Sequence, residues 1–201
     1  MKLYYSPGAC SLAVHIALIE SGLPFDTVKT DIRAKTYDGG DYRKVNPKGS
    51  VPALQLDDGS ILTEAAVVLQ YIADQKPEKH LVPRLGTIER YRCQEWLNYV
   101  SSEIHKGFSP LWNPRWPEDA QAMTRDLLAG KFNFLSSHLE KHQFLMGDQF
   151  TVADAYLFTT LRWSKHLKVD LPKWPALLSY VERVQSRPSV QEALKREGLA
   201  S

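Results

Sequence analysis

Cysteine is scarce in this chain, and long apolar runs and blocks of one charge are absent. The two cysteines, Cys10 and Cys93, lie far apart and form no CxxC pair, which argues against a disulfide scaffold and favours a reducing cytoplasm. No apolar run approaches the roughly 18 residues of a membrane span, and we expect no signal peptide. The 25 basic and 23 acidic residues are interleaved, so no nucleic-acid-binding surface is indicated.

The first part of the chain mixes strand-like and helix-like segments. Strands are predicted at residues 2–5, 26–30, 53–56 and 60–62, the last two joined as a hairpin. One helix is predicted after Cys10, and a second carries apolar residues at helical spacing from Ala65 to Ile72. These elements predict a small α/β domain over residues 1–77.

The remainder of the chain shows only helical patterns. Apolar residues recur at helical spacing from Ile88 to Ile104 and again from Leu128 to Leu139. Thr151-Val-Ala-Asp154 has the form of a capping box, with Asp in place of the usual Glu. Pro175 and Pro188 stand where the first turns of two further helices are expected. We predict an all-helical domain over residues 86–201.

Cys10 occupies an informative position in the first domain. It follows a short strand and the turn signal Ser6-Pro7-Gly8, and a helical pattern begins there. The unpaired N–H groups and the positive end of the dipole at a helix start favour a thiolate. This arrangement indicates a thiol site, although an isolated cysteine is more often an inert core residue.

Two other segments of this domain carry features of a ligand site. Pro52 enters a strand, and a cis Val51–Pro52 bond is predicted to turn the backbone of Val51 outward to pair with an extended peptide. A plain loop-to-strand proline is an equal alternative. At Thr63-Glu64-Ala65 another helix begins, whose N–H groups suit a carboxylate while Glu64 suits an ammonium. Together the N–H groups and the Glu64 carboxylate fit an amino-acid zwitterion. Taken alone, Glu64 is interpreted as an acidic residue that is favourable in the first turn of a helix.

These motifs resemble those of a bacterial, beta-class cytosolic glutathione transferase. The resemblance extends over nearly the whole chain and is carried by Ser6–Cys10, Val51–Leu54, Thr63-Glu64, Glu95–Asn98, Glu103–Phe108 and Phe150–Asp154. It implies a thioredoxin-like first domain and an all-helical second domain with a hydrophobic co-substrate site. It also implies a homodimer, and glutathione as co-substrate.

The resemblance assigns roles to individual residues. Cys10 and His105 are the catalytic residues it implies, with His105 either stabilising the anionic sulfur or handling a proton. Without the resemblance, His105 is interpreted as an ordinary histidine on the face of a helix. The implied glutathione contacts are the backbone of Val51 before cis Pro52, the Glu64 carboxylate for the ammonium, the Ala65 N–H for the carboxylate, Lys35 for the glycyl carboxylate, and Asn98, Ser102, Glu103 and Lys106 along the first helix of the second domain. Many relatives carry serine where this chain has Ala65.

The function predicted on this basis is conjugation of the glutathione thiolate to hydrophobic electrophiles, as in detoxification. The alternatives are a glutathione-dependent thiol oxidoreductase or dehalogenase that uses Cys10, and a non-catalytic binding or regulatory protein on the same fold. Trp112 and Trp116 suit either a wall for a hydrophobic co-substrate or the core of the helical domain. His138 and His142 are four residues apart, but no third metal ligand follows at a recognisable distance, so no metal is predicted.

Overall fold

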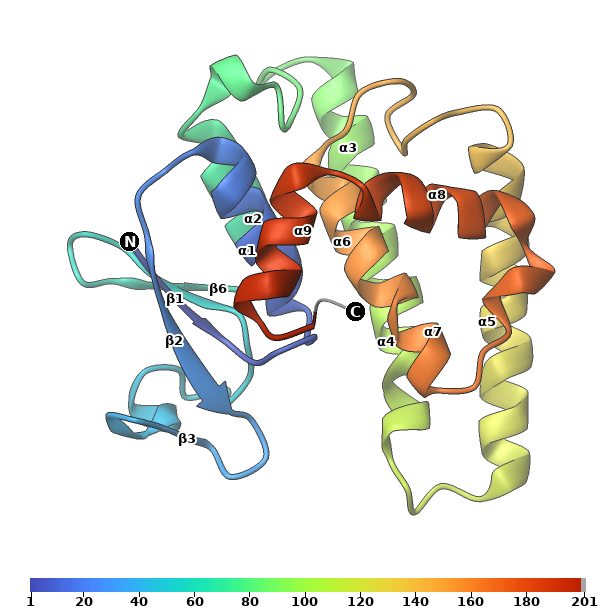
Figure 1. The fold of residues 1–201 in the computed structure, drawn as a ribbon, viewed down its shortest axis with the longest axis horizontal. Coiled ribbons are helices and arrows are strands. Elements are labelled where there is room, and N and C mark those ends of the chain that lie inside the picture. The colour runs from blue at the N-terminus through green and yellow to red at the C-terminus, as the bar shows by residue number, and fades with distance from the viewer. Residues whose placement is uncertain (200–201) are drawn as a thin grey trace. The chain divides into compact units, whose positions relative to one another are not determined.

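A computed structural model describes residues 1–199, and the chain divides into two compact units that we describe separately (Figure 1). Unit 1 comprises Met1–Val82 together with the C-terminal segment from Arg187, and unit 2 comprises Pro83–Ser186. The C-terminal helix therefore packs with the first unit, whereas the sequence pattern places all of residues 86–201 in one helical domain. That segment is helical, as expected, but its packing partners lie far away in the sequence.

Unit 1 contains one mixed sheet. Its strands are β1 Lys2–Tyr5, β2 Asp26–Asp31, β3 Thr36–Tyr37, β4 Gly40–Asp41, β5 Ala53–Gln55 and β6 Ile61–Thr63. They lie in the order β4-β3-β2-β1-β5-β6, with β1 parallel to β2 and the other pairs antiparallel. The four predicted strands are present within a residue or two, and the short pair β3 and β4 was not predicted.

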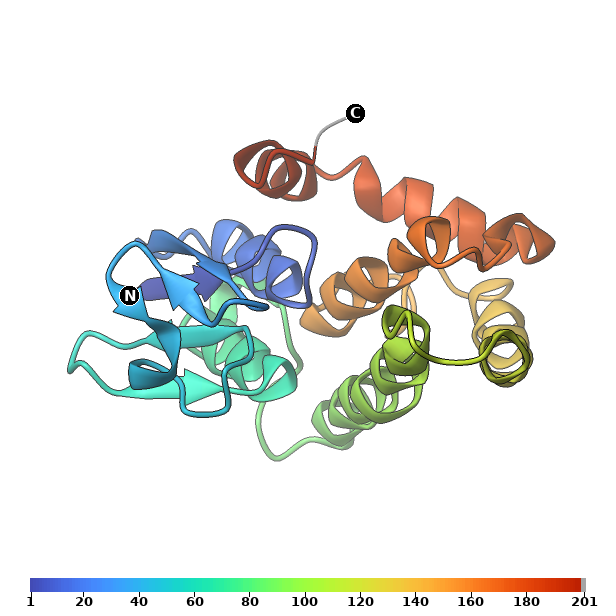
Figure 2. The ribbon, with the colours of Figure 1, turned by 90° about the horizontal axis from the view of Figure 1, so that it is seen from below.

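Three helices of unit 1 pack around one another. They are α1 Ser11–Ser21, α2 Ala65–Asp74 and α9 Pro188–Arg196, and the 3-10 turns are Tyr42–Lys44 and Pro77–Lys79. Helix α1 contacts α2, α9 and β1, and α9 lies beside it in both views (Figures 1 and 2). Because α1 is covered on several sides, most of its residues are buried, including Val14 and His15 as well as Leu12 and Ile16.

Unit 2 is built from helices. They are α3 Ile88–Tyr99, a π-helical segment Val100–His105, α4 Lys106–Phe108, a 3-10 turn Ser109–Trp112, α5 Glu118–Leu139, α6 Val152–Leu161, α7 Trp163–His166, a 3-10 turn Leu171–Lys173 and α8 Pro175–Gln185. The helix expected from Ile88 to Ile104 therefore changes to π-helix at Val100. Buried residues of α3, α5 and α6 form the core, among them Leu97, Phe132 and Leu157.

The helix starts predicted from local sequence are confirmed. At α6 the Thr151 side chain and the Asp154 side chain each bond to the other's backbone, which completes the capping box. Pro175 and Pro188 begin α8 and α9. Within the described residues, no helix is long and apolar enough to cross a membrane.

Candidate functional site

Cys10 lies at the N-cap of α1, as the sequence predicts. Gly8, at φ +71°, forms the turn before it, and this left-handed conformation favours glycine. The Cys10 side chain is 8% exposed, and its Sγ lies 3.1 Å from the carbonyl oxygen of Val51. Since a carbonyl oxygen can only accept, the Cys10 thiol is the donor in this contact. A ligand that pairs with the Val51 backbone therefore arrives beside the sulfur.

A buried carboxylate from the end of the chain supports the turn that carries Cys10. Glu197 accepts hydrogen bonds from the Gly8 N–H at 2.9 Å and pairs with His15 Nδ1 at 3.0 Å. Both side chains of the Glu197–His15 pair are essentially excluded from solvent. This pair could not be predicted from the sequence, because its members are 182 positions apart and no local pattern connects them.

The loop before β5 is held by several hydrogen bonds. The Val51–Pro52 peptide bond is cis, as predicted. The Tyr42 hydroxyl and the Asn46 amide both donate to the Ser50 carbonyl, at 2.9 Å and 2.7 Å. Lys35 Nζ donates to the Gly49 carbonyl at 2.6 Å. The predicted site residues Lys35, Val51 and Pro52 thus belong to one fixed loop region.

Glu64 and Ala65 form the start of α2. Glu64 is the N-cap and has φ +71°, which is unusual for a residue with a side chain. Its side chain does not cap the helix; instead its carboxylate pairs with Lys48 Nζ at 2.5 Å, and Lys48 also donates to Thr63 Oγ1 at 3.0 Å. The Glu64 carboxylate is exposed to solvent and already pairs with one ammonium group, that of Lys48.

The predicted site residues of unit 2 lie on α3, on the π-helical segment and at the start of α4. The Ser102 hydroxyl donates to the Asn98 carbonyl at 3.0 Å. Glu103 forms an ion pair with Lys131 of α5 at 2.8 Å. Hydrogen bonding to Lys131 is the main cause that lowers the pKa of Glu103. Lys106 is exposed at the start of α4. Asn98, Ser102 and Glu103 are thus neighbours within this unit.

His105 lies among aromatic residues. Its Nδ1 is 2.7 Å from the Tyr156 hydroxyl, and its ring centroid is 4.9 Å from that of Trp163. Trp163 also packs edge-on against Phe108 and Trp112, at 5.8 Å and 5.9 Å. Tyr156 and Trp163 were not predicted from the sequence, because both fall within the ordinary apolar pattern of their helices.

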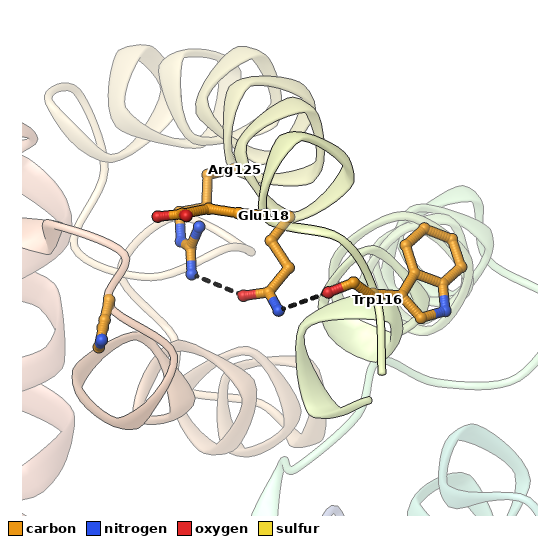
Figure 3. Close-up of a pocket in the computed structure, with 5 residues that line it drawn as sticks. Trp116, Glu118 and Arg125 are labelled. Carbon is orange, nitrogen blue, oxygen red and sulfur yellow. Dashed lines mark hydrogen bonds between the residues drawn. The ribbon is translucent and has the colours of Figure 1, made fainter. Parts of the chain in front are cut away.

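The two tryptophans considered as a co-substrate wall are exposed and are not core residues. Trp112 is 48% and Trp116 is 42% exposed. Near Trp116 a hollow of about 470 Å³ is lined by Trp116, Glu118, Gln121, Arg125 and Lys168. Figure 3 shows that the Trp116 ring points away from it and that its carbonyl accepts from Gln121. The hollow is therefore polar and separate from the aromatic group around His105.

Cys93 differs from Cys10 in its surroundings. It is fully buried in α3, and burial raises the pKa of its thiol to about 11. The expectation that it is a packing residue agrees with this position. Among residues 1–199, no group of three or more His, Cys, Asp and Glu side chains is arranged to hold a metal ion.

Comparisons with known proteins bear on both units. The glutathione S-transferase N-terminal domain matches residues 8–75 and the glutathione S-transferase C-terminal domain matches residues 99–188. Glutathione S-transferase GstA of Escherichia coli O157:H7 is 46% identical over 200 residues, covering 99% of this chain and 100% of that protein.

Solved structures give the same result. A sphingomonad glutathione S-transferase complexed with glutathione is 43% identical with a TM-score of 0.96, covering 100% of both chains. A ternary complex of BphK, a bacterial glutathione transferase, is 50% identical with a TM-score of 0.97, covering 99% of this chain and 100% of that one. A beta-class enzyme of Sphingomonas chungbukensis is 46% identical with a TM-score of 0.96, covering 100% of both chains.

A thioredoxin-like unit combined with a helical unit matches the fold of solved glutathione transferases. The chain belongs to the glutathione S-transferase family. Within that family it is of the bacterial beta-class type, as the sequence motifs predict.

Proposed function

We propose that the protein conjugates the thiolate of glutathione to hydrophobic electrophiles. The observation that carries this proposal is the contact between the Cys10 thiol and the Val51 carbonyl in the loop before β5. In the reaction the glutathione thiolate attacks the electrophilic carbon, a carbon–sulfur bond forms, and the leaving group departs with its electron pair. The protein contributes by positioning the thiol and favouring its ionised form.

Unit 1 carries the proposed glutathione contacts. The Val51 backbone pairs with the cysteinyl residue, Glu64 binds the γ-glutamyl ammonium and the Ala65 N–H binds its carboxylate. Lys35 binds the glycyl carboxylate. In the free protein Lys48 pairs with Glu64, so the ligand's ammonium joins or displaces a lysine that is already there. Ala65 supplies no hydroxyl, which weakens binding modestly relative to a serine at this position.

Unit 2 carries the groups proposed for the second substrate and for the sulfur. Trp163 packs against His105 and Phe108 and also against Trp112, and Trp112 is the exposed ring of this group, which suits contact with an apolar or aryl electrophile. His105 acts on the anionic sulfur, and Asn98, Ser102, Glu103 and Lys106 contribute polar contacts to glutathione. The proposed reaction uses no metal ion.

We further propose that the protein is a homodimer in the cytoplasm. Trp96, Tyr99, Phe134 and His138 form an outer aromatic cluster on α3 and α5, with ring centroids 4.7 to 6.0 Å apart. Phe134 is 53% exposed, and exposed apolar clusters of this kind are characteristic of protein contact surfaces. A second copy of the chain is the proposed partner. Both cysteines are free thiols, as expected in a reducing compartment.

A second function follows from the chemistry of Cys10. As a thiolate it can attack a mixed disulfide of glutathione and another thiol, taking up glutathione and releasing that thiol. A second glutathione thiolate then releases oxidised glutathione and restores Cys10. Glutathione-dependent dehalogenation of an aromatic compound uses the same site and is a variant of conjugation. A non-catalytic role is the remaining alternative.

One set of assays separates these functions. Steady-state rates of wild type and Cys10→Ala are measured with glutathione against aryl halides, hydroperoxides and mixed disulfides. Conjugation as the main activity gives the highest rates with aryl halides. Weak conjugation that survives Cys10→Ala, together with loss of disulfide reduction, identifies the oxidoreductase. A folded protein that is inactive in every assay and does not bind glutathione contradicts the proposed function.

A further inference from the structure

Lys48 belongs to the loop before β5, and hydrogen bonds fix its backbone there. The buried Asn46 side chain accepts from the Lys48 N–H at 3.1 Å and donates to the Ser50 carbonyl at 2.7 Å. The Gly49 N–H donates to the Asn46 carbonyl at 2.8 Å, and Gly49 has φ +63°, a conformation that favours glycine. The loop therefore holds the backbone of Lys48 in one place, although the Lys48 side chain is exposed.

The Lys48 side chain reaches the start of α2. Its ammonium group donates to Thr63 Oγ1 at 3.0 Å and to the Glu64 carboxylate at 2.5 Å. The side chains of Lys48 and Glu64 are 55% and 64% exposed. An ion pair between two exposed side chains is weak, because water screens the charges and both side chains lose freedom. Lys48 can therefore exchange Glu64 for another carboxylate with little loss.

The γ-glutamyl group of glutathione brings such a carboxylate. Its ammonium and its carboxylate are attached to the same carbon, so an ammonium bound to Glu64 places the carboxylate next to the neighbours of Glu64. Lys48 is one neighbour, and Ala65 at the start of α2 is another. Backbone N–H groups at a helix start favour an anion, but the alanine side chain has no donor to add. Lys48 supplies a cationic donor for the carboxylate.

The charged groups of unit 1 fit this arrangement. Lys35 donates to the Gly49 carbonyl at 2.6 Å, so Lys35 and Lys48 both lie next to Gly49. Glutathione carries two carboxylates and one ammonium at neutral pH. Lys35, Lys48 and Glu64 offer one opposite charge for each of these three groups, and hydrogen bonds between opposite charges are the stronger kind.

We propose that Lys48 is a specificity-determining residue that binds the γ-glutamyl carboxylate of glutathione while Glu64 binds the ammonium. This inference rests on the proposed function and decides what happens to the Lys48–Glu64 pair when the ligand binds. The ligand's ammonium joins Glu64, and Lys48 turns from Glu64 to the ligand's carboxylate. Lys48 thereby selects tripeptides that carry a carboxylate at this position over tripeptides that carry only an amine there.

The role is tested by isothermal titration calorimetry of the full chain with glutathione and with 4-aminobutanoyl-Cys-Gly. This analogue keeps the ammonium of the γ-glutamyl group and lacks its carboxylate. We expect Lys48→Met to weaken glutathione binding about 5-fold or more, because a hydrogen bond between charged groups contributes to affinity even when exposure reduces it. Binding of the analogue should not weaken, so the preference for glutathione over the analogue should fall.

Two further variants serve as controls. Lys48→Arg keeps a cationic donor and should retain most of the affinity for glutathione. Lys79→Met removes the same charge from an exposed lysine in the 3-10 turn beyond the other end of α2, and it should leave both affinities unchanged. Because Lys48 and Lys79 are both exposed, these substitutions leave the core of unit 1 intact.

Tighter binding of glutathione by Lys48→Met overturns the proposal, because it shows that Lys48 only competes with the ligand for Glu64. An unchanged affinity overturns it as well, and so does an equal loss of affinity for glutathione and the analogue. In each of these cases the wild type still binds glutathione and the proposed function stands. A wild type that does not bind glutathione contradicts both the proposed function and the role of Lys48.

Discussion

The two cysteines illustrate how position determines the chemistry of one residue type. Cys10 lies at a helix start with 8% of its side chain exposed, and it contacts a backbone carbonyl that a peptide ligand would approach. Cys93 is sealed inside unit 2. Burial is the main cause that raises the pKa of its thiol to about 11, and a hydrogen bond with Thr151 opposes that effect.

We therefore expect selective alkylation. Iodoacetamide at pH 8 should modify Cys10 in the native protein and leave Cys93 untouched, because the thiolate is the reactive species and Cys93 is neither ionised nor accessible. Mass spectrometry of peptides identifies the modified residue. Cys10→Ser should take up no reagent when folded, and both cysteines of wild type should react in denaturant. Rapid modification of Cys93 in the native protein would show that its thiol is accessible and would contradict this prediction.

Glu64 carries the charge on which recognition of the ligand's amino group depends. Glu64→Gln keeps the shape of the side chain and removes the charge. We expect glutathione binding to weaken about 10-fold or more, since hydrogen bonds to charged groups contribute about 1.5–3 kcal/mol. Isothermal titration calorimetry measures the change, with Glu89→Gln on the exposed surface of α3 as the control. Equal affinities of the Glu64 and Glu89 variants would remove Glu64 from the proposed site.

At the scale of elements, local sequence predicted those parts of the fold that depend on local interactions. The capping box of α6 and the prolines that begin α8 and α9 follow from side chains within a single turn. The strands β3 and β4 were missed because two residues cannot show an alternating pattern. The π-helical segment was missed because its apolar spacing resembles that of an α-helix.

The capping box gives a prediction for pH. Asp154 is fully buried and accepts hydrogen bonds from Leu145, Thr151 and Tyr180. Burial outweighs these bonds and raises the pKa of Asp154 to about 6. The folded state thus binds the proton more tightly than the unfolded state does. Its stabilising contribution is complete below about pH 4 and is lost as pH rises through 6, by on the order of 3 kcal/mol.

Asp154→Asn removes this titration. We expect the wild type to lose stability relative to this variant as pH rises from 4.5 to 7, measured by urea unfolding at each pH. Asp170→Asn, at an exposed carboxylate of the same unit, should show a difference from wild type that varies little with pH. If wild type instead gains stability relative to Asp154→Asn over this range, the hydrogen bonds dominate and the carboxylate is ionised throughout.

At the scale of the whole molecule, contacts between distant parts of the chain could not be predicted from the sequence. The pairing of Glu197 with Gly8 and His15 joins the two ends of the chain beneath the Cys10 turn. Tyr156 contacts His105 across 51 positions. The predicted site residues came from local motifs and from the resemblance to the family. The residues that support them were missed because only the folded chain brings them together.

The outer aromatic cluster leads to a prediction about assembly. Phe134→Asp places a charge among Trp96, Tyr99 and His138, and we expect it to convert a dimer into monomers because an unpaired charge is costly to bury in an interface. Sedimentation velocity measures the change in mass. Met123→Asp is the control, an exposed apolar residue three turns earlier on α5. A wild type that is already monomeric at all concentrations would contradict the proposed homodimer.

The central claim is that glutathione binds along unit 1 with its sulfur beside Cys10. A crystal structure of the protein grown with glutathione tests it most directly. We expect the cysteinyl backbone on Val51 and the γ-glutamyl group on Glu64 and Ala65, with the ligand sulfur within contact distance of the Cys10 Sγ. Glutathione bound elsewhere, or bound to unit 1 with its sulfur turned away from Cys10, would contradict the claim.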